Sequence, residues 1–330
     1  MSASSVSEIL ASADWQSHPS PFDSDGVQYA WDSTSLGLLK ECPRKYYYKM
    51  ICGWDRQRKS HHLIFVQLLH TGLETYDKVS TELLADGIVP EDAHEAAVLA
   101  AIDKIMRDSV GYIPGEARGK PDNAKTRRNL IRVLVWYFEQ YGKNDNNKVV
   151  VLSNGKPAVE LSFKVNVARG LVLCGHLDKV VEFGKDAYVM DHKSTSSTVT
   201  GSSAREFFRS FNPSNQMSLY PLGAYMAYSL PIRGVIIDAI QIGVETISFG
   251  RDITHRHTSQ MEEFLDAFYT YHSLAVQFTE TNSWPMNETS CGNYGGCEFR
   301  DICARSPHVR DKFLATWFVK GERWNPLKPR

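Results

Sequence analysis

Three side chains near the middle of the chain are of the types that bind a metal ion and activate water: Asp178, Asp191 and Lys193. They lie in residues 175–193, whose two halves are rich in Val, Leu and Phe and meet at Gly184-Lys185. Because glycine at the first loop position favours a two-residue type II′ turn, the pattern predicts a β-hairpin with Gly184-Lys185 as its loop.

The predicted hairpin register brings two carboxylates together. Counting outward from Gly184-Lys185 places Asp178 opposite Asp191 on one sheet face, with Cβ atoms about 4.5–5.5 Å apart. Two ionised carboxylates at about 5 Å repel by about 3 kcal/mol at an effective dielectric near 20, and a divalent cation between them reverses the sign. Oxygen ligands of this kind, completed by water and phosphate oxygens, suit Mg²⁺ or Mn²⁺.

Strand alternation then positions the lysine. Lys193 shares the face of Asp191, while His192 points to the opposite face. A lysine there could orient or deprotonate a water, or stabilise negative charge as a phosphodiester is attacked. Taken alone, an Asp-x-Lys pattern after an upstream Asp also occurs on ordinary solvent-exposed strands.

Two helical pairs add polar groups. Gln216 and Tyr220 are four apart, hence on one face of the helix after the hairpin, where they could contact Lys193 or a phosphate. His70 and Glu74 are also four apart on an earlier helix, and the imidazole could be a further metal ligand. The alternatives are a half-buried Tyr220 and a partly buried, hydrogen-bonded His70.

Four cysteines have spacing suited to a metal cluster. Cys291, Cys297 and Cys303 are each separated by five residues, with glycines between the first two, and Cys42 is the candidate fourth ligand. Thiolates bind Zn²⁺ and a 4Fe-4S cluster alike. Six cysteines in 330 residues are too few for a disulfide framework, although disulfides are the alternative. Cys52 and Cys174 are predicted to be buried small hydrophobes, with Cys52 the substitute if Cys42 is not a ligand.

Composition predicts a folded globular protein, with 42% hydrophobic residues and a net charge of -1. The sequence contains no apolar run long enough to cross a bilayer, and its first twenty residues lack the features of a signal peptide. We therefore expect no membrane association and a cytoplasmic location, including the nucleoid or, for a phage protein, the host cytoplasm.

Because the net charge is close to zero, nucleic acid would have to be bound locally, by two basic segments. They are Lys40, Arg44, Lys45, Lys49, Arg56, Arg58 and Lys59 around Tyr46, Tyr47, Tyr48 and Trp54, and Arg118, Lys120, Lys125, Arg127, Arg128 and Arg132. Burial of the tyrosines on a solvated helix is an equal alternative.

The expected organisation is a flexible leader (1–30) followed by one α/β (α+β) domain (31–330). Helical periodicity covers 31–147, interrupted at Gly111–Asp122. Residues 148–248 contain four successive antiparallel strands (148–152, 158–167, 171–183 and 187–193), a helix (215–228) and a strand (234–244). Residues 249–330 hold a long helix (259–278) and the cysteine-rich return.

Six segments, in order, resemble the PD-(D/E)XK nuclease superfamily, especially the branch with the RecB and AddB nuclease domains and the CRISPR-associated adaptation nucleases. They are Cys42-Pro43-Arg44-Lys45-Tyr46-Tyr47-Tyr48, His70-Thr71-Gly72-Leu73-Glu74, Gly175-His176-Leu177-Asp178, Asp191-His192-Lys193, Gln216 to Tyr220 and the C-terminal cysteines. The resemblance covers most of the chain. One departure is the five residues between Cys291 and Cys297, where these relatives commonly have two.

The resemblance implies a restriction-endonuclease-like core, a central mixed sheet flanked by helices, with a helical N-terminal insertion. It implies that His70, Asp178, Asp191 and the His192 carbonyl bind Mg²⁺ or Mn²⁺, that Lys193 is catalytic, and that Gln216 and Tyr220 support it. Glu160 is either a further active-site acid or a surface residue. Cys42, Cys291, Cys297 and Cys303 would hold a structural 4Fe-4S cluster.

The function expected is a metal-dependent DNase, an exonuclease on single-stranded DNA or DNA ends, in recombination, repair or phage DNA processing, with a helicase or recombination protein as a possible partner. One alternative is a nuclease-fold protein that binds DNA or a helicase without cleaving. A second is a zinc-stabilised nucleic-acid-binding module whose hairpin acids are merely exposed. Iron and sulfide content separates the second alternative from the others.

Overall fold

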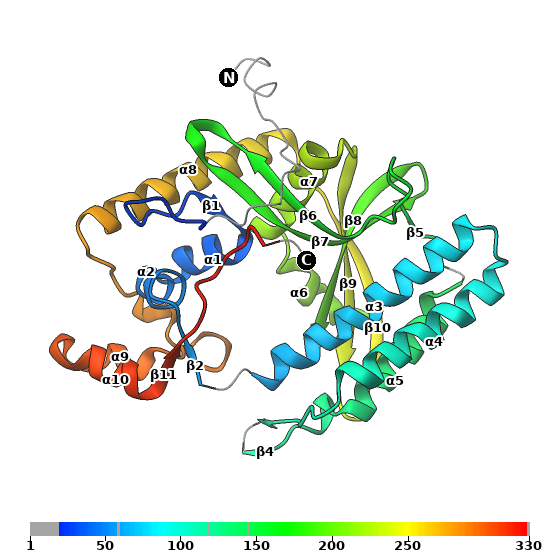
Figure 1. Cartoon of the computed structure of the whole chain (residues 1–330), viewed down its shortest axis with the longest axis horizontal. Coiled ribbons are helices and arrows are strands. Elements are labelled where there is room, and N and C mark those ends of the chain that lie inside the picture. The colour runs from blue at the N-terminus through cyan, green and yellow to red at the C-terminus, as the bar shows by residue number, and fades with distance from the viewer. Residues whose placement is uncertain (1–19, 58–59, 118, 144, 329–330) are drawn as a thin grey trace.

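The computed structural model describes residues 20–57, 60–117, 119–143 and 145–328. Its centre is a seven-stranded mixed sheet in the order β1-β7-β8-β9-β10, with β5 and β6 also paired to β7 (Figure 1). Pairing is parallel for β1–β7 and β8–β9 and antiparallel elsewhere in this sheet. The strands span Ala30–Trp31 (β1), Lys148–Val149 (β5), Val159–Asn166 (β6), Val172–Phe183 (β7), Asp186–Thr195 (β8), Ile232–Ile242 (β9) and Ile247–Thr254 (β10). The α/β fold and its central mixed sheet are confirmed.

Helices cover both faces of the sheet. The apolar side chains of α1 (Ser33–Glu41), α7 (Asn215–Tyr228) and α8 (Thr258–Glu280) join the larger core cluster with β6 and β7. On the other side α3 (His61–Ala85), α4 (Pro90–Asp108) and α5 (Arg127–Tyr141) pack as a helical layer against the β9–β10 end (Figure 1). The predicted break at Pro43 is present, because α1 ends at Glu41 and α2 spans Pro43–Tyr46.

The predicted hairpin register is confirmed. Gly184 has φ +67°, which a type II′ turn requires at its first position, and the ladder runs from Phe183–Asp186 to Lys179–Met190. It stops one pair short of Asp178 and Asp191, where β7 and β8 separate. β8 continues beside β9 as far as Thr195. The two candidate ligands therefore lie directly beyond the end of the β7–β8 ladder.

Three expectations need correction. Residues 1–19 of the predicted leader lie outside the described residues, but residues 20–30 are packed: Phe22 and Ala30 are buried and β1 adds to the sheet. β10 was missed, because Ile247–Thr254 mixes charged and small residues with apolar ones. The four expected strands pair in antiparallel fashion as predicted, but they do not pair in simple succession, since β5 and β6 both pair with β7.

The C-terminal segment returns to the N-terminal helices. β11 (Phe318–Lys320) pairs with β2 (Trp54–Arg56), and the Arg44 amide donates to the Pro285 carbonyl at 3.1 Å. Two short helices, α9 (Arg300–Cys303) and α10 (Arg310–Trp317), lie beside this pair (Figure 1). Short elements elsewhere are β3 (Glu116–Ala117), β4 (Lys120–Pro121) and α6 (Ala204–Arg209). No described helix is long and apolar enough to cross a bilayer.

Candidate active site

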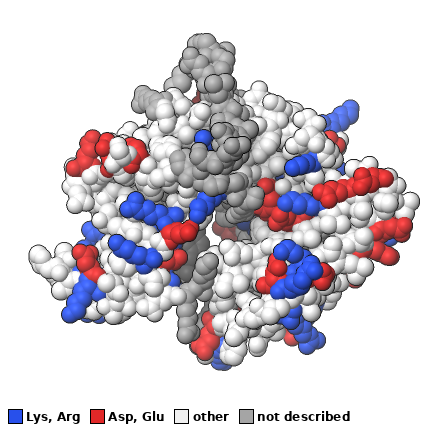
Figure 2. Space-filling view, viewed as in Figure 1, with Lys and Arg blue, Asp and Glu red and all other residues white. Residues whose placement is uncertain are grey.

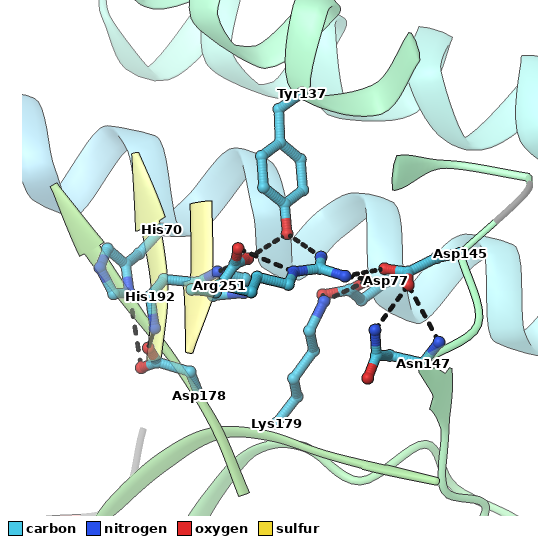
Figure 3. A network of polar contacts seen from close by, with 10 residues as sticks. His70, Asp77, Tyr137, Asp145, Asn147, Asp178, Lys179, His192 and Arg251 are labelled. Carbon is cyan, nitrogen blue, oxygen red and sulfur yellow. Dashed lines mark hydrogen bonds and ion pairs between the residues drawn. The ribbon is translucent and has the colours of Figure 1, made fainter. Parts of the chain in front are cut away.

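Asp178 lies where β7 leaves β8, and its carboxylate replaces the missing strand pairing. The backbone N–H of His192 donates to Asp178 Oδ2 at 2.8 Å. On the other oxygen, His70 Nδ1 from α3 lies 3.5 Å from Asp178 Oδ1 (Figure 3). Both oxygens of this buried carboxylate are thus oriented, one by the strand and one by the helix.

Glu160 joins these two residues. The pairs Val159–Lys179 and Leu161–Leu177 flank it, so it lies across from Asp178 on the neighbouring strand. Its φ of +51° is a left-handed conformation, uncommon for a residue other than glycine and typical of functional sites. His70, Glu160 and Asp178 each offer a ligand atom within 4.8 Å of the others. The structure therefore favours Glu160 as an active-site acid over a surface residue.

Asp191 and Lys193 form the adjoining part of the site. Lys193 Nζ lies 2.6 Å from Asp191 Oδ2, and the Asp191 side chain is 2% exposed against 26% for Lys193. The predicted alternation is confirmed, because His192 points the other way and its Nδ1 lies 2.9 Å from Asp238 Oδ2. Lys193 can therefore reach solvent while holding a buried carboxylate.

The electrostatics of the two aspartates differ. Burial opposes ionisation of Asp178, but the charges of His70, His192 and Lys193 outweigh it and hold its pKa well below the usual range. Burial raises the pKa of Asp191, the Lys193 ammonium opposes that rise, and the nearby Asp178 charge adds to it. A divalent cation would remove this conflict by favouring the ionised form of both.

A second buried cluster lies behind the site. Arg251 Nε donates to Asp238 Oδ1 at 2.9 Å, and Tyr137 Oη donates to Asp238 Oδ2. Arg251 Nη1 also donates to both oxygens of Asp145, at 2.9 and 2.8 Å (Figure 3). This cluster was not anticipated; the one available indication was a charged residue, Asp238, inside the apolar strand predicted at 234–244. It holds the imidazole of His192, whose backbone contacts Asp178.

Gln216 and Tyr220 lie on one face of α7, as their spacing predicts. Gln216 Nε2 donates to Tyr220 Oη at 2.6 Å, and Tyr220 is 7% exposed. The helix that carries them packs against β6, β7, β8 and β9. Their hydrogen bond fixes the amide and phenol relative to each other; any role toward Lys193 stays a prediction.

The four candidate cysteine ligands gather at the join between the chain's two ends. Burial raises the pKa of the Cys297 thiol, and Cys291 and Cys42 are near enough to raise it further. Burial likewise raises the pKa of Cys303, with Cys297 and Cys42 adding to the rise. The Asn287 amide donates to Cys42 Sγ at 3.4 Å. The structure thus brings Cys42 near Cys297 and Cys303, and ligation of a metal by the four cysteines stays a prediction.

The other cysteine predictions are partly confirmed. All six cysteines are free, so the disulfide alternative is not seen. Cys174 is fully buried, as predicted for a small hydrophobe. Cys52 is only partly buried, and its thiol and the Tyr47 hydroxyl share a hydrogen bond, so the expectation of a buried residue there is wrong.

The two basic segments are largely engaged within the protein. Tyr46 and Tyr48 are buried, which favours the alternative of core tyrosines. Lys49 pairs with Glu298 at 2.9 Å, and Arg127 donates to Ser109 Oγ at 2.8 Å. Figure 2 shows basic and acidic side chains interspersed over this face rather than one continuous basic surface. Arg58, Lys59 and Arg118 lie outside the described residues.

Comparison with known families agrees with this geometry. The model of the PD-(D/E)XK nuclease superfamily matches residues 31–304, and the chain belongs to that superfamily. A search of the curated proteins finds no match. A solved structure titled "Crystal structure of SSO0001" is similar at 13% identity, covering 72% of this chain and 74% of that one, with a TM-score of 0.28. The family defines a metal-dependent nuclease class, and the acid cluster is its candidate metal site.

Proposed function

We propose that this protein is a metal-dependent DNase that hydrolyses phosphodiester bonds as an exonuclease, on single-stranded DNA or DNA ends. The observation that carries the proposal is the group His70, Glu160 and Asp178, with ligand atoms within 4.8 Å, beside the Asp191–Lys193 ion pair. An imidazole, carboxylates and a lysine that lie together where the β7–β8 ladder ends suit metal-assisted hydrolysis.

Each residue has a distinct part in this proposal. His70, Glu160, Asp178 and Asp191 would hold Mg²⁺ or Mn²⁺, with the His192 carbonyl as a further ligand. The bound ion would stabilise charge developing on a phosphoryl oxygen. Lys193 Nζ, fixed by Asp191 and partly exposed, orients the attacking water. Gln216 and Tyr220 support the lysine or a phosphate.

The test is digestion of end-labelled DNA with Mg²⁺ or Mn²⁺, using linear single-stranded, linear duplex and circular substrates. We expect wild type to degrade linear DNA from its ends and leave the circle intact, and Asp191→Ala to leave all of the substrates intact. Cleavage of the circle would replace the exonuclease proposal with an endonuclease. DNA binding by wild type without cleavage would favour the non-cleaving alternative, a DNA end-holder or helicase partner.

We further propose that Cys42, Cys291, Cys297 and Cys303 hold a 4Fe-4S cluster that fastens the C-terminal return to α2. Its role is structural, because thiolate ligation would close a loop of roughly 250 residues and restrict the unfolded chain.

The Cys303→Ser variant should lose visible absorbance and melt at a lower temperature. Cys52→Ser, which alters the neighbouring partly buried cysteine, should retain both. Unchanged absorbance in Cys303→Ser would contradict the cluster, and zinc without iron would favour the zinc-stabilised alternative.

The setting proposed for this activity is recombination, repair or phage DNA processing in the cytoplasm, with a helicase or recombination protein as partner. It rests on the resemblance to the RecB and AddB nuclease domains, which act on DNA ends. The chain is proposed to form a single nuclease domain from residue 31 to 330. Co-purification from cells with and without the Asp191→Ala change would identify a partner independently of cleavage.

A further inference from the structure

A second group of metal-binding side chains lies at the start of α3, away from the acid cluster. His61 and His62 begin this helix, and Asp122 faces them from the segment between β4 and α5. Each of the three offers a ligand atom within 4.8 Å of the others. The PD-(D/E)XK site and the cysteine cluster use none of these residues.

The distances suit joint ligation of one ion, and His61 Nε2 and Asp122 Oδ2 are also within hydrogen-bond distance. Asp122 Oδ2 lies 3.1 Å from His61 Nε2 and 3.6 Å from His62 Nδ1. The longer of these two distances exceeds that of a hydrogen bond. Two ligands about 2.05 Å from a tetrahedral zinc ion are about 3.3 Å apart, and the two observed separations lie on either side of that value.

The surrounding backbone holds these ligands in place. Asp122 is 7% exposed; its amide donates to the Gly115 carbonyl at 2.9 Å, and its Oδ1 accepts from the Ala124 amide at 3.2 Å. That leaves Oδ2 directed at the histidines. A Cβ at Gly115 would lie 2.2 Å from His61 Nδ1, so only glycine lets this ring reach its position. The His62 side chain is 52% exposed, which gives an ion access from solvent.

We propose that His61, His62 and Asp122 form a binding site for one late divalent transition-metal ion of the zinc type, with water completing the coordination. Two imidazole nitrogens and one carboxylate oxygen suit Zn²⁺ rather than Mg²⁺. His61 precedes His70 by nine residues on the same helix, or roughly 13 Å along its axis. Paired catalytic metals lie about 3.5–4 Å apart, so this ion would not take part in two-metal hydrolysis.

The role that follows is to fasten the small β3–β4 hairpin to the helix that carries His70. Asp122 directly follows β4, and Lys120, Lys125 and Arg128 lie in or next to this segment. Of these, Lys125 has its ammonium over the Phe65 ring, 4.6 Å from the centroid. Bound zinc would therefore order basic side chains that belong to the second predicted nucleic-acid-binding segment.

The experiment is zinc titration by calorimetry of the full-length protein, comparing wild type with His62→Gln. Both proteins keep the acid cluster and all six cysteines, so zinc bound at those sites cancels in the difference. His62 is half-exposed, and we expect the variant to fold with an unchanged melting temperature without zinc. Wild type should bind one more equivalent of zinc than His62→Gln. The matched control His308→Gln alters an exposed histidine elsewhere and should bind as wild type does.

A second measurement follows the hairpin itself. At zinc concentrations about ten times Kd, local opening of the segment should become about tenfold rarer, and tryptic cleavage after Lys125 should slow accordingly. Zinc should give His62→Gln no such protection. Equal zinc stoichiometry in wild type and His62→Gln, or equal protection in both, would overturn the proposal.

Discussion

Two buried polar clusters lie on opposite faces of β8, and they differ in charge balance. Around Asp191 there are three carboxylates, those of Glu160, Asp178 and Asp191, with Lys193 and His70 as counter-charges. Around Asp238 there are two carboxylates, those of Asp238 and Asp145, which share the Arg251 guanidinium, and Asp238 also accepts from Tyr137 and contacts His192.

The contrast separates a site that stabilises the fold from one that needs a cation. Buried charges are tolerated when paired and hydrogen-bonded, and the Asp238 cluster satisfies that condition by itself. The acid cluster does not, and its unmatched negative charge is what a divalent ion would neutralise. Removing an acid from the acid cluster should therefore lower activity and leave stability nearly unchanged. Removing the acid Asp238 should instead lower stability.

The largest effect is expected at Asp191. Asp191→Ala should lower DNase activity by about 10⁴-fold, because loss of metal-assisted stabilisation removes about 5 kcal/mol from the reaction. The free energy of unfolding should change little, since removal of one acid also relieves repulsion. Rates of DNA digestion and urea denaturation measure the two quantities. Asp186→Ala, in the same hairpin but exposed, is the control and should match wild type.

Replacing Asp238 should mainly lower the stability of the fold. Asp238→Ala leaves the buried Arg251 guanidinium without its main partner, and we expect a loss of about 3–4 kcal/mol in the free energy of unfolding. Urea denaturation measures it, with Asp252→Ala on the exposed side of β10 as the matched change. If Asp238→Ala were as stable as Asp252→Ala, the cluster would not be a stabilising element.

Two lysines of the hairpin sharpen the comparison. Lys193→Met should lower activity about 100-fold and leave stability near wild type, because Lys193 is partly exposed and positions water. Lys179→Met should instead destabilise the fold by about 2–3 kcal/mol, because Lys179 Nζ lies 2.9 Å from Asp77 Oδ2 and both side chains are buried. Single-turnover rates and thermal melts of both variants test this, and similar profiles for the two would contradict it.

The smallest effect concerns Glu160. In wild type, Mn²⁺ at about 100 times Kd should raise the free energy of unfolding by about 2.7 kcal/mol. Glu160→Gln should weaken binding about tenfold and so reduce that gain by about 1.4 kcal/mol at the same concentration. Addition of a chelator should bring both proteins to their metal-free stability. If Mn²⁺ raised the free energy of unfolding of Glu160→Gln as much as that of wild type, Glu160 would not be a metal ligand.

The resemblance was most informative where segments are short and contiguous. Asp178, Asp191 and Lys193 occupy one hairpin, and Gln216 and Tyr220 one helix, so their relative positions follow from local geometry. The basic segments were less predictable. Whether Lys49 or Arg127 faces solvent depends on partners such as Glu298, 249 positions away, which composition does not encode.

The sequence by itself determined the register of the hairpin, because period-2 alternation and a Gly-first turn act over a few residues and fix which side chains face one another. Apolar periodicity also predicted the helical region before the sheet and the helices that correspond to α7 and α8. Only the tertiary structure decided that His70 and Glu160 meet Asp178, that β7 and β8 separate there, and that Asp238 braces His192. Those contacts depend on how α3, β6 and β9 pack together, and packing between distant elements is set by the shape of the whole core rather than by any local pattern.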